Sequence, residues 1–266
     1  MVIFQLLNTI IFLLYGMQAS GNEKLPREFP AMGSAVCDKP SDFNEAGCGV
    51  CPKFMGAEQP LNRNGGLGIY SVLMGRFTAA GKTEALLLGY ASCFSHADGH
   101  ASAFLLRKEQ GSWRRLSYFH NDGPVGLCQK IAGPSGARDL VLCTEEDYGA
   151  GGISVIGFDV NGKVKTNSVL VQTWTYPFRA AEKQKHCSSF QAGVKKASFD
   201  SVEISIFLTS FDVDPPIDCS TESEGTTSKI SNSKKLGDIA VFTSTGDTFA
   251  PDEKTKKLLS EVAMSR

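Results

Sequence analysis

The sequence predicts an all-β protein built from repeated antiparallel strand units, with one short helix at the carboxyl end. Three observations support this class. Apolar and polar residues alternate over several stretches of strand length, which is the period of two that a half-buried strand requires. A pattern of strand, glycine-containing loop and strand recurs at intervals of about 50 to 60 residues. Only the last segment has the spacing of an amphipathic helix.

The amino end predicts export. Residues 2–15 form an apolar run that is shorter than the roughly 20 residues of a membrane-spanning helix and has the length of a signal-peptide core. Ala19 and Gly21 provide small residues for cleavage after Gly21, although no Lys or Arg precedes the run. We expect residues 1–21 to be a signal peptide, and an uncleaved anchor is the alternative. Cleavage would give an exported chain, periplasmic or extracellular, without integral membrane association.

Composition and charge narrow the functional classes. The 266 residues carry 27 Lys and Arg against 28 Asp and Glu, which gives a net charge of −1. Nucleic acids and anionic membranes require clustered cationic side chains, so neither is expected as a partner. Charged residues make up 21% of the chain and hydrophobic residues 42%, values that indicate a folded domain and neither a disordered chain nor a multi-span membrane protein.

Residues 22–64 predict loops and short turns. Pro, Gly, Asn and acidic residues are frequent there, and hydrophobic periodicity is weak. The segment contains Cys37, Cys48 and Cys51. We expect these three, together with Cys93, to staple the segment to the first strand unit.

Strands are expected over residues 65–250. The clearest covers residues 202–209, where apolar side chains occupy every second position and only Phe207 breaks the alternation. Residues 169–176 alternate in the same way. The dipeptide Asn161-Gly162 between two apolar stretches predicts a hairpin with a type I′ turn.

The last segment, residues 251–266, predicts a short helix, with a frayed tail as the alternative. Pro251 suits the first helical position, and acidic residues follow it in the first turn. The apolar stripe of this helix would consist of Leu258, Leu259 and Val262.

Two copies of the strand unit align with an offset of 55 residues. Residues 81–88 and 136–143 each contain a glycine turn, an acidic residue and then an apolar run. A looser third copy begins at Phe199 and contains residues 212–235, which we expect to be a long surface insertion. One such unit cannot bury both faces of its sheet, so the units are expected to stack on one another.

The first copy resembles a known repeat family. Gly75-Arg76-Phe77-Thr78-Ala79-Ala80-Gly81-Lys82-Thr83-Glu84-Ala85-Leu86 is similar to the motif G-D-F-x-G-D-G-x-x-D-L of FG-GAP and VCBS-type β-propeller repeats. The glycines, Phe77 and the acid at Glu84 are kept, whereas Thr78 and Ala80 stand where that family has calcium-binding aspartates. The resemblance implies propeller-like blades in an incomplete or small propeller, without good calcium ligands. A β-sandwich is the alternative.

The eight cysteines of an exported chain predict disulfide bonds. Cys128 and Cys143 stand at the two ends of a candidate hairpin and are the pair that local geometry favours. Cys187 and Cys219 flank the third unit and form a second expected pair.

Two clusters suggest alternative chemistry. Cys48-Gly49-Val50-Cys51 is a CxxC motif that can exchange disulfides at a helix start, but no βαβ pattern surrounds it. His96, Asp98 and His100 would share one face of a strand and can ligate Zn or Fe there. The repeat alignment instead places these three in a polar loop between strands.

The sequence therefore predicts an exported, disulfide-stabilised, non-catalytic β-repeat protein. It contains no nucleophile elbow, phosphate-binding loop, dinucleotide fingerprint or HExxH motif, and no cofactor is expected. The role would be structural or would be the binding of another macromolecule or a glycan. A metal-dependent enzyme using His96, Asp98 and His100 and a thiol–disulfide oxidoreductase using Cys48 and Cys51 are the alternatives.

Overall fold

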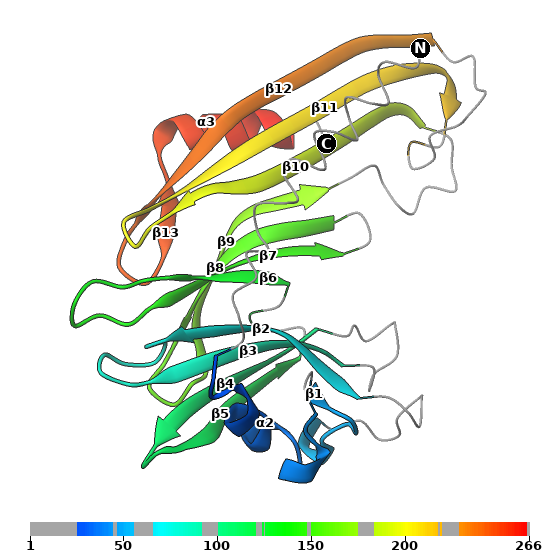
Figure 1. Ribbon diagram of the computed structural model, residues 1–266. Helices are drawn as coiled ribbons and strands as arrows, with labels where there is room; N and C mark the ends of the chain where they lie inside the picture. The colour runs from blue at the N-terminus through cyan, green and yellow to red at the C-terminus, as the bar shows by residue number, and fades with distance from the viewer. Residues whose placement is uncertain are drawn as a thin grey trace.

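The protein is all-β, with two antiparallel sheets and a short C-terminal helix, as the sequence predicts (Figure 1). The computed structural model describes residues 26–44, 47–55, 66–91, 101–120, 124, 126–147, 150–174, 184–217, 219 and 229–264.

Each strand pairs with the next strand in the sequence, so both sheets are meanders. The first sheet contains β1 (Gly47–Cys48), β2 (Leu67–Gly75), β3 (Glu84–Ala91), β4 (Ala101–Glu109) and β5 (Ser112–His120). The second contains β6 (Leu127–Ile131), β7 (Leu140–Asp147), β8 (Ala150–Phe158), β9 (Val164–Trp174), β10 (Gln184–Ala197), β11 (Ser201–Ile217), β12 (Lys229–Ser244) and β13 (Phe249–Pro251). The helices are α2 (Phe29–Val36) and α3 (Glu253–Ala263), with 3-10 turns at Pro40–Asp42 and Lys53–Met55.

The second sheet consists of two four-stranded parts that barely join. Within the described residues, β9 and β10 pair at one position only, Trp174 with Phe190, whereas every other neighbouring pair of long strands is paired over most of its length. The described strands therefore form three successive units, β2–β5, β6–β9 and β10–β13. They follow one another in an open stack, and the second sheet curls between its two parts (Figure 1). A closed propeller ring is not seen among these strands.

The period of two explains how the units stack. On β3, Leu86 and Leu88 face a cluster that includes Val141 and Ile156 of the second unit. Ala85 and Leu87 point the other way, into a cluster with α2. β3 is thus buried on both faces, which is why its sequence is a continuous apolar run.

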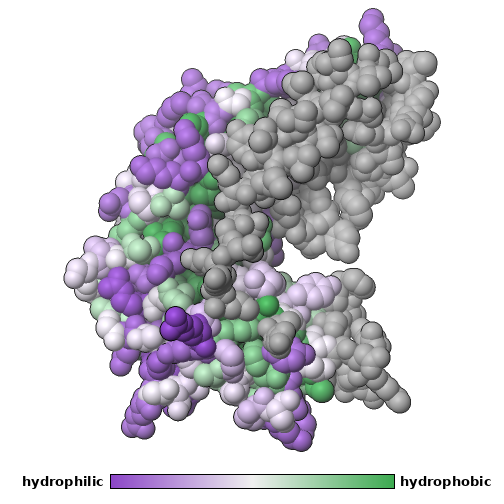
Figure 2. Space-filling view, viewed as in Figure 1, coloured by the Kyte–Doolittle hydropathy of each residue, from purple (hydrophilic) through white to green (hydrophobic). Residues whose placement is uncertain are grey.

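The same alternation continues through the second and third units. On β7, Val141 faces the first unit, whereas Leu140 and Leu142 face the third. The apolar alternation predicted over residues 202–209 is confirmed, because Val202, Ile204, Ile206 and Leu208 are buried and Phe207 is 45% exposed. Figure 2 shows hydrophobic residues gathered toward the middle of the molecule and hydrophilic ones along its left rim.

The predicted C-terminal helix is present, but it begins two residues later than expected. Pro251 ends β13, and Asp252 is the N-cap, with its side chain accepting a hydrogen bond from Thr255 N at 2.7 Å. As the N-cap, Asp252 accepts a hydrogen bond from a backbone N–H of the first helical turn, whereas a proline side chain has no acceptor to do so. Leu258 and Val262 are buried as expected, while Leu259 is only partly buried.

Three further expectations need correction. The amino segment was expected to contain only loops and turns, yet it forms α2, whose Phe29 and Met32 pack against the first sheet. The expected surface insertion begins and ends as strand, because β11 extends to Ile217 and β12 begins at Lys229. A hairpin does occur at Asn161-Gly162, but Gly162 alone of the two has a positive φ, so the turn is not type I′.

Two buried acids fasten the turns at the starts of β3 and β7. Glu84 accepts hydrogen bonds from Thr78 N at 2.8 Å and from Arg107 Nε at 2.9 Å. Asp139 accepts from Gly133 N in its own unit and from Arg76 N in the first unit, both at 2.9 Å. Asp139 therefore links two units.

The environment of Asp139 stabilises its charged form. Burial by itself raises the pKa of this carboxyl, but hydrogen bonds from Gly133 N, Arg76 N and the Arg76 guanidinium outweigh burial and hold the pKa below its ordinary value. The guanidinium lies 3.2 Å from Asp139 Oδ1.

Replacing Asp139 should destabilise the fold. Asp139→Ala leaves the N–H groups of Arg76 and Gly133 without this partner, and we expect a loss of about 2 to 3 kcal/mol in the free energy of unfolding, measured by urea denaturation. Asp214→Ala, which removes an exposed carboxylate, is the matched control and should stay within about 0.5 kcal/mol of wild type. Equal effects of the two variants would contradict the assignment.

The contribution of Asp139 should also depend on pH. Because its folded pKa is depressed, the stability it provides is fully present above the ordinary value of 3.8 and is lost as the pH falls through the folded pKa. Asp139→Asn cannot titrate, so the stability difference between wild type and this variant should narrow on acidification. Urea midpoints of both proteins between about pH 6 and pH 2 measure it. A constant difference across that range would show that Asp139 does not contribute in this way.

Candidate functional site

The predicted metal ligands cannot be assessed directly. His96, Asp98 and His100 lie outside the described residues, between the end of β3 at Ala91 and the start of β4 at Ala101. Among the residues that are described, no group of three or more His, Cys, Asp or Glu side chains is placed to hold a metal ion.

The two cysteine pairs expected from the sequence are both joined. Cys128 and Cys143 occupy directly opposed positions on β6 and β7 and form a disulfide. Cys187 and Cys219 form another, beside Val213 in a small apolar cluster. Each bond connects parts of one unit.

The CxxC motif does not form a dithiol pair. Cys48 is bonded to Cys37, and Cys51 is also disulfide-bonded. The Cys37–Cys48 bond closes a loop within the amino segment, so these two cysteines do not staple that segment to the first unit as expected. No cysteine in the described part of the chain is free, and this arrangement provides no thiolate for exchange.

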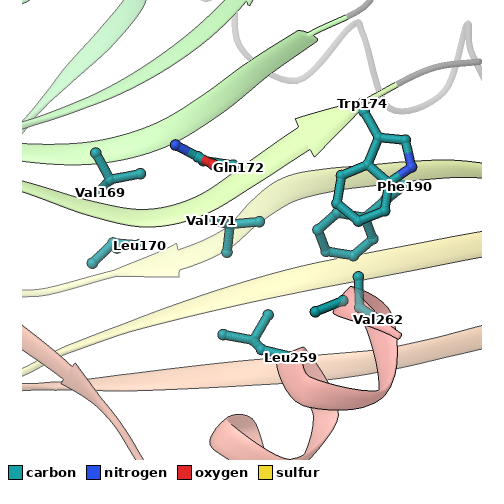
Figure 3. Close-up of a pocket in the computed structure, with 9 residues that line it drawn as sticks. Val169, Leu170, Val171, Gln172, Trp174, Phe190, Leu259 and Val262 are labelled. Atoms are coloured by element: carbon teal, nitrogen blue, oxygen red, sulfur yellow. The ribbon is translucent and has the colours of Figure 1, made fainter. Parts of the chain in front are cut away.

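An open apolar groove lies where β9 and β10 separate. Its volume is about 370 Å³, and we call it the β9 groove (Figure 3). It is lined by Val169, Leu170, Val171, Gln172 and Trp174 of β9, Phe190 of β10, and Leu259, Val262 and Ala263 of α3.

The contact between Trp174 and Phe190 closes one end of the groove. The rings of Trp174 and Phe190 lie 4.9 Å apart between centroids, at the position where the described parts of β9 and β10 pair. From there the strands diverge, and α3 presents Leu259 and Val262 to the space between them (Figure 3). The groove thus depends on two consecutive strands and on a helix that is distant from them in sequence.

The edge of β9 in this groove has no strand partner among the described residues. One side of β9 pairs with β8, but between Thr166 and Thr173 its other side forms no ladder with any strand that the structure describes. Unpaired edges attract other chains, and proteins usually protect them with charged side chains. Residues 166–173 contain no charged residue.

The edge of β12 provides the contrast within the same sheet. It carries Lys229, Lys234 and Lys235, all exposed, which discourage pairing with another chain. Nearer α3, this edge is closed by Thr255, whose hydroxyl accepts from Val241 N at 2.7 Å and donates to Val241 O at 3.2 Å. The exposed edge of β12 is therefore protected, whereas the side of β9 that faces the groove carries no such charge.

The described lining of the β9 groove is mostly apolar. None of its nine residues is titratable, so these side chains include no general acid, general base, nucleophile or metal ligand. The groove presents apolar side chains and the side of β9 that forms no ladder with a described strand over residues 166–173.

Sequence reasoning did not find this groove. Trp174, which is partly buried at the groove wall, packs against the main core cluster and was not singled out. The only local signal was the uncharged run at residues 166–173, which a central strand would also show.

Comparison with protein-family models, curated proteins and solved structures found no significant match to this chain. Within the described residues, neither helix has the length and apolar character needed to cross a lipid bilayer.

Removal of the Cys128–Cys143 bond should weaken the fold measurably. The bond closes a separation of 15 residues, and the chain-entropy model gives about 3 kcal/mol for such a loop. We expect the double Cys128→Ser, Cys143→Ser variant to lose about that much in urea unfolding without reductant. The double Cys187→Ser, Cys219→Ser variant removes a separation of 32 residues and should lose somewhat more. If the first variant lost less than about 1 kcal/mol, the bond would not constrain the unfolded chain as this model requires.

Proposed function

We propose that this protein is an exported, disulfide-braced binding protein without catalytic activity, and that its ligand is an extended segment of another protein. The observation that carries the proposal is the uncharged edge of β9 beside an apolar groove, an edge that pairs with no described strand over residues 166–173. The described residues favour binding over catalysis because the lining residues cannot move protons or ligate metals.

An extended segment matches both properties of the β9 groove. Its backbone would add to β9 as a further strand, with main-chain hydrogen bonds providing affinity. Alternate side chains of that segment would point into the space lined by Phe190, Leu259 and Val262. Specificity would then come from apolar residues at every second position.

Two features support export. The cysteines of the described chain are oxidised, in three intramolecular disulfides with both partners described, and such bonds persist mainly outside the cytosol. The amino-terminal apolar run at residues 2–15 has the length of a signal-peptide core. Mass determination of the amino terminus of the secreted protein tests cleavage after Gly21.

Binding can be tested with displayed and synthetic peptides. We expect a library of random ten-residue peptides to enrich sequences with apolar residues at alternate positions. Synthetic versions should bind the purified protein in fluorescence anisotropy. Methylation of every second peptide nitrogen should weaken binding at least tenfold, since it removes the donors that pair with a strand edge.

A matched pair of variants locates the site. Val169, in the groove, is 55% exposed, and Val160, in the turn before β9, is 65% exposed. Val169→Lys should reduce peptide affinity at least tenfold, because it places a charge at the open edge, whereas Val160→Lys should leave affinity unchanged. Equal affinities for the two variants, or no enriched peptides, would overturn the proposal. Enrichment of a glycan from an array in place of peptides would do so as well.

The metal-dependent alternative remains a prediction. Metal analysis of the purified protein tests it, since a stoichiometric transition metal that is lost in the double His96→Ala, His100→Ala variant would support an enzyme. Protein without such a metal after purification in the absence of chelators would contradict it.

A further inference from the structure

A second cleft, distinct from the β9 groove, lies between the first and second units. Its volume is about 480 Å³, and we call it the cation cleft. It is lined by Met74, Gly75, Arg76, Gly81, Lys82, Thr83, Lys130, Ala132 and Asp139. It shares no residue with the β9 groove.

The stacking of the two units brings these cations together. Arg76 and Lys82 lie in the turn that joins β2 to β3, whereas Lys130 lies on β6. The turn between β2 and β3 is at the left in Figure 1, on the side where Figure 2 shows hydrophilic surface. Lys130 Nζ donates to the carbonyl oxygen of Met74 at 2.8 Å, so its ammonium group is held against the first unit.

The single carboxylate of the cleft is already engaged. Asp139 accepts hydrogen bonds from Arg76 N, Gly133 N and the Arg76 guanidinium, so its charge is balanced by Arg76. Neither Lys82 nor Lys130 forms an ion pair with any carboxylate in the part of the chain that the structure describes. Two positive charges of one cleft thus have no carboxylate partner among the described residues.

The backbone at the mouth of the cleft is also open. Gly81 has a φ of +73°, and nothing lies within 4 Å of the position that a Cβ would occupy. A ligand can therefore approach the turn closely beside Lys82. Any side chain at this position would be strained in addition to covering the opening.

We propose that the cation cleft binds a tetrahedral dianion, either sulfate or phosphate, as a free ion or as an ester group on a larger ligand. The two negative charges of such an anion match the positive charges of Lys82 and Lys130, which form no ion pair with a described carboxylate. Their ammonium groups each provide donors that suit such oxygens. This site does not rest on the function proposed for the β9 groove, and either can fail alone.

Calorimetric titration with sodium sulfate and sodium phosphate, at constant ionic strength set by sodium chloride, tests the proposal. We expect saturable binding to wild type and at least a tenfold loss in affinity in the double Lys82→Gln, Lys130→Gln variant. The double Lys195→Gln, Lys196→Gln variant removes the same charge from exposed positions on β10 and should bind like wild type. Thermal unfolding of all three proteins without added anion verifies that they are folded.

The results of these titrations distinguish a free anion from an ester group, and they show whether the cleft binds an anion at all. Tighter binding of a sulfated disaccharide or a sugar phosphate than of the free ion would identify an ester group as the ligand, while equal affinities would identify the free anion. Absence of saturable binding to wild type would overturn the proposal. An equal loss in both lysine variants would also overturn it, because the effect would then come from net charge alone.

Discussion

The fold depends on the burial of single strands on both faces. β3 and β7 are apolar at consecutive positions, and Leu86, Leu87, Val141 and Leu142 are all essentially inaccessible to water. Burial of an aliphatic side chain of this size contributes roughly 1.5 to 3 kcal/mol. A lone four-stranded unit would expose half of these residues, so the second unit must have neighbours on both sides. Stacking is thus a requirement of the sequence.

Polar contacts set the arrangement of the stack in detail. Asp139 carries hydrogen bonds from the first unit into the second, and Asp247 of the third unit lies 2.8 Å from Lys165 Nζ of the second. The disulfides add bracing within units, on the order of 3 kcal/mol each. That is no more than the combined burial of two leucines, which contributes roughly 3 to 6 kcal/mol. The cysteines therefore reinforce a structure that the apolar contacts already specify.

Both proposed sites arise where stacking leaves a gap. The β9 groove opens because β10 pairs with β9 only at Trp174 in the described chain and then turns to cover the second unit. The cation cleft opens where the turns of the first and second units meet without filling the space between them. Each site includes residues from an element far along the chain, α3 in the groove and β6 in the cleft, and local sequence patterns gave no indication that they would meet the other lining residues.

The amino-acid sequence was sufficient to predict the strand pattern, the C-terminal helix and the disulfide between Cys128 and Cys143. Alternation at residues 202–209 and the spacing of Cys128 and Cys143 are local properties, because a pleated strand and a hairpin impose them on residues close in the chain. The three-dimensional fold was needed to show that Cys48 bonds to Cys37, that residues 29–36 are helical, and that one side of β9 forms no ladder with a described strand over residues 166–173. Whether an edge is paired is a property of its neighbour. That neighbour is placed by apolar packing between whole units, which no short stretch of sequence encodes.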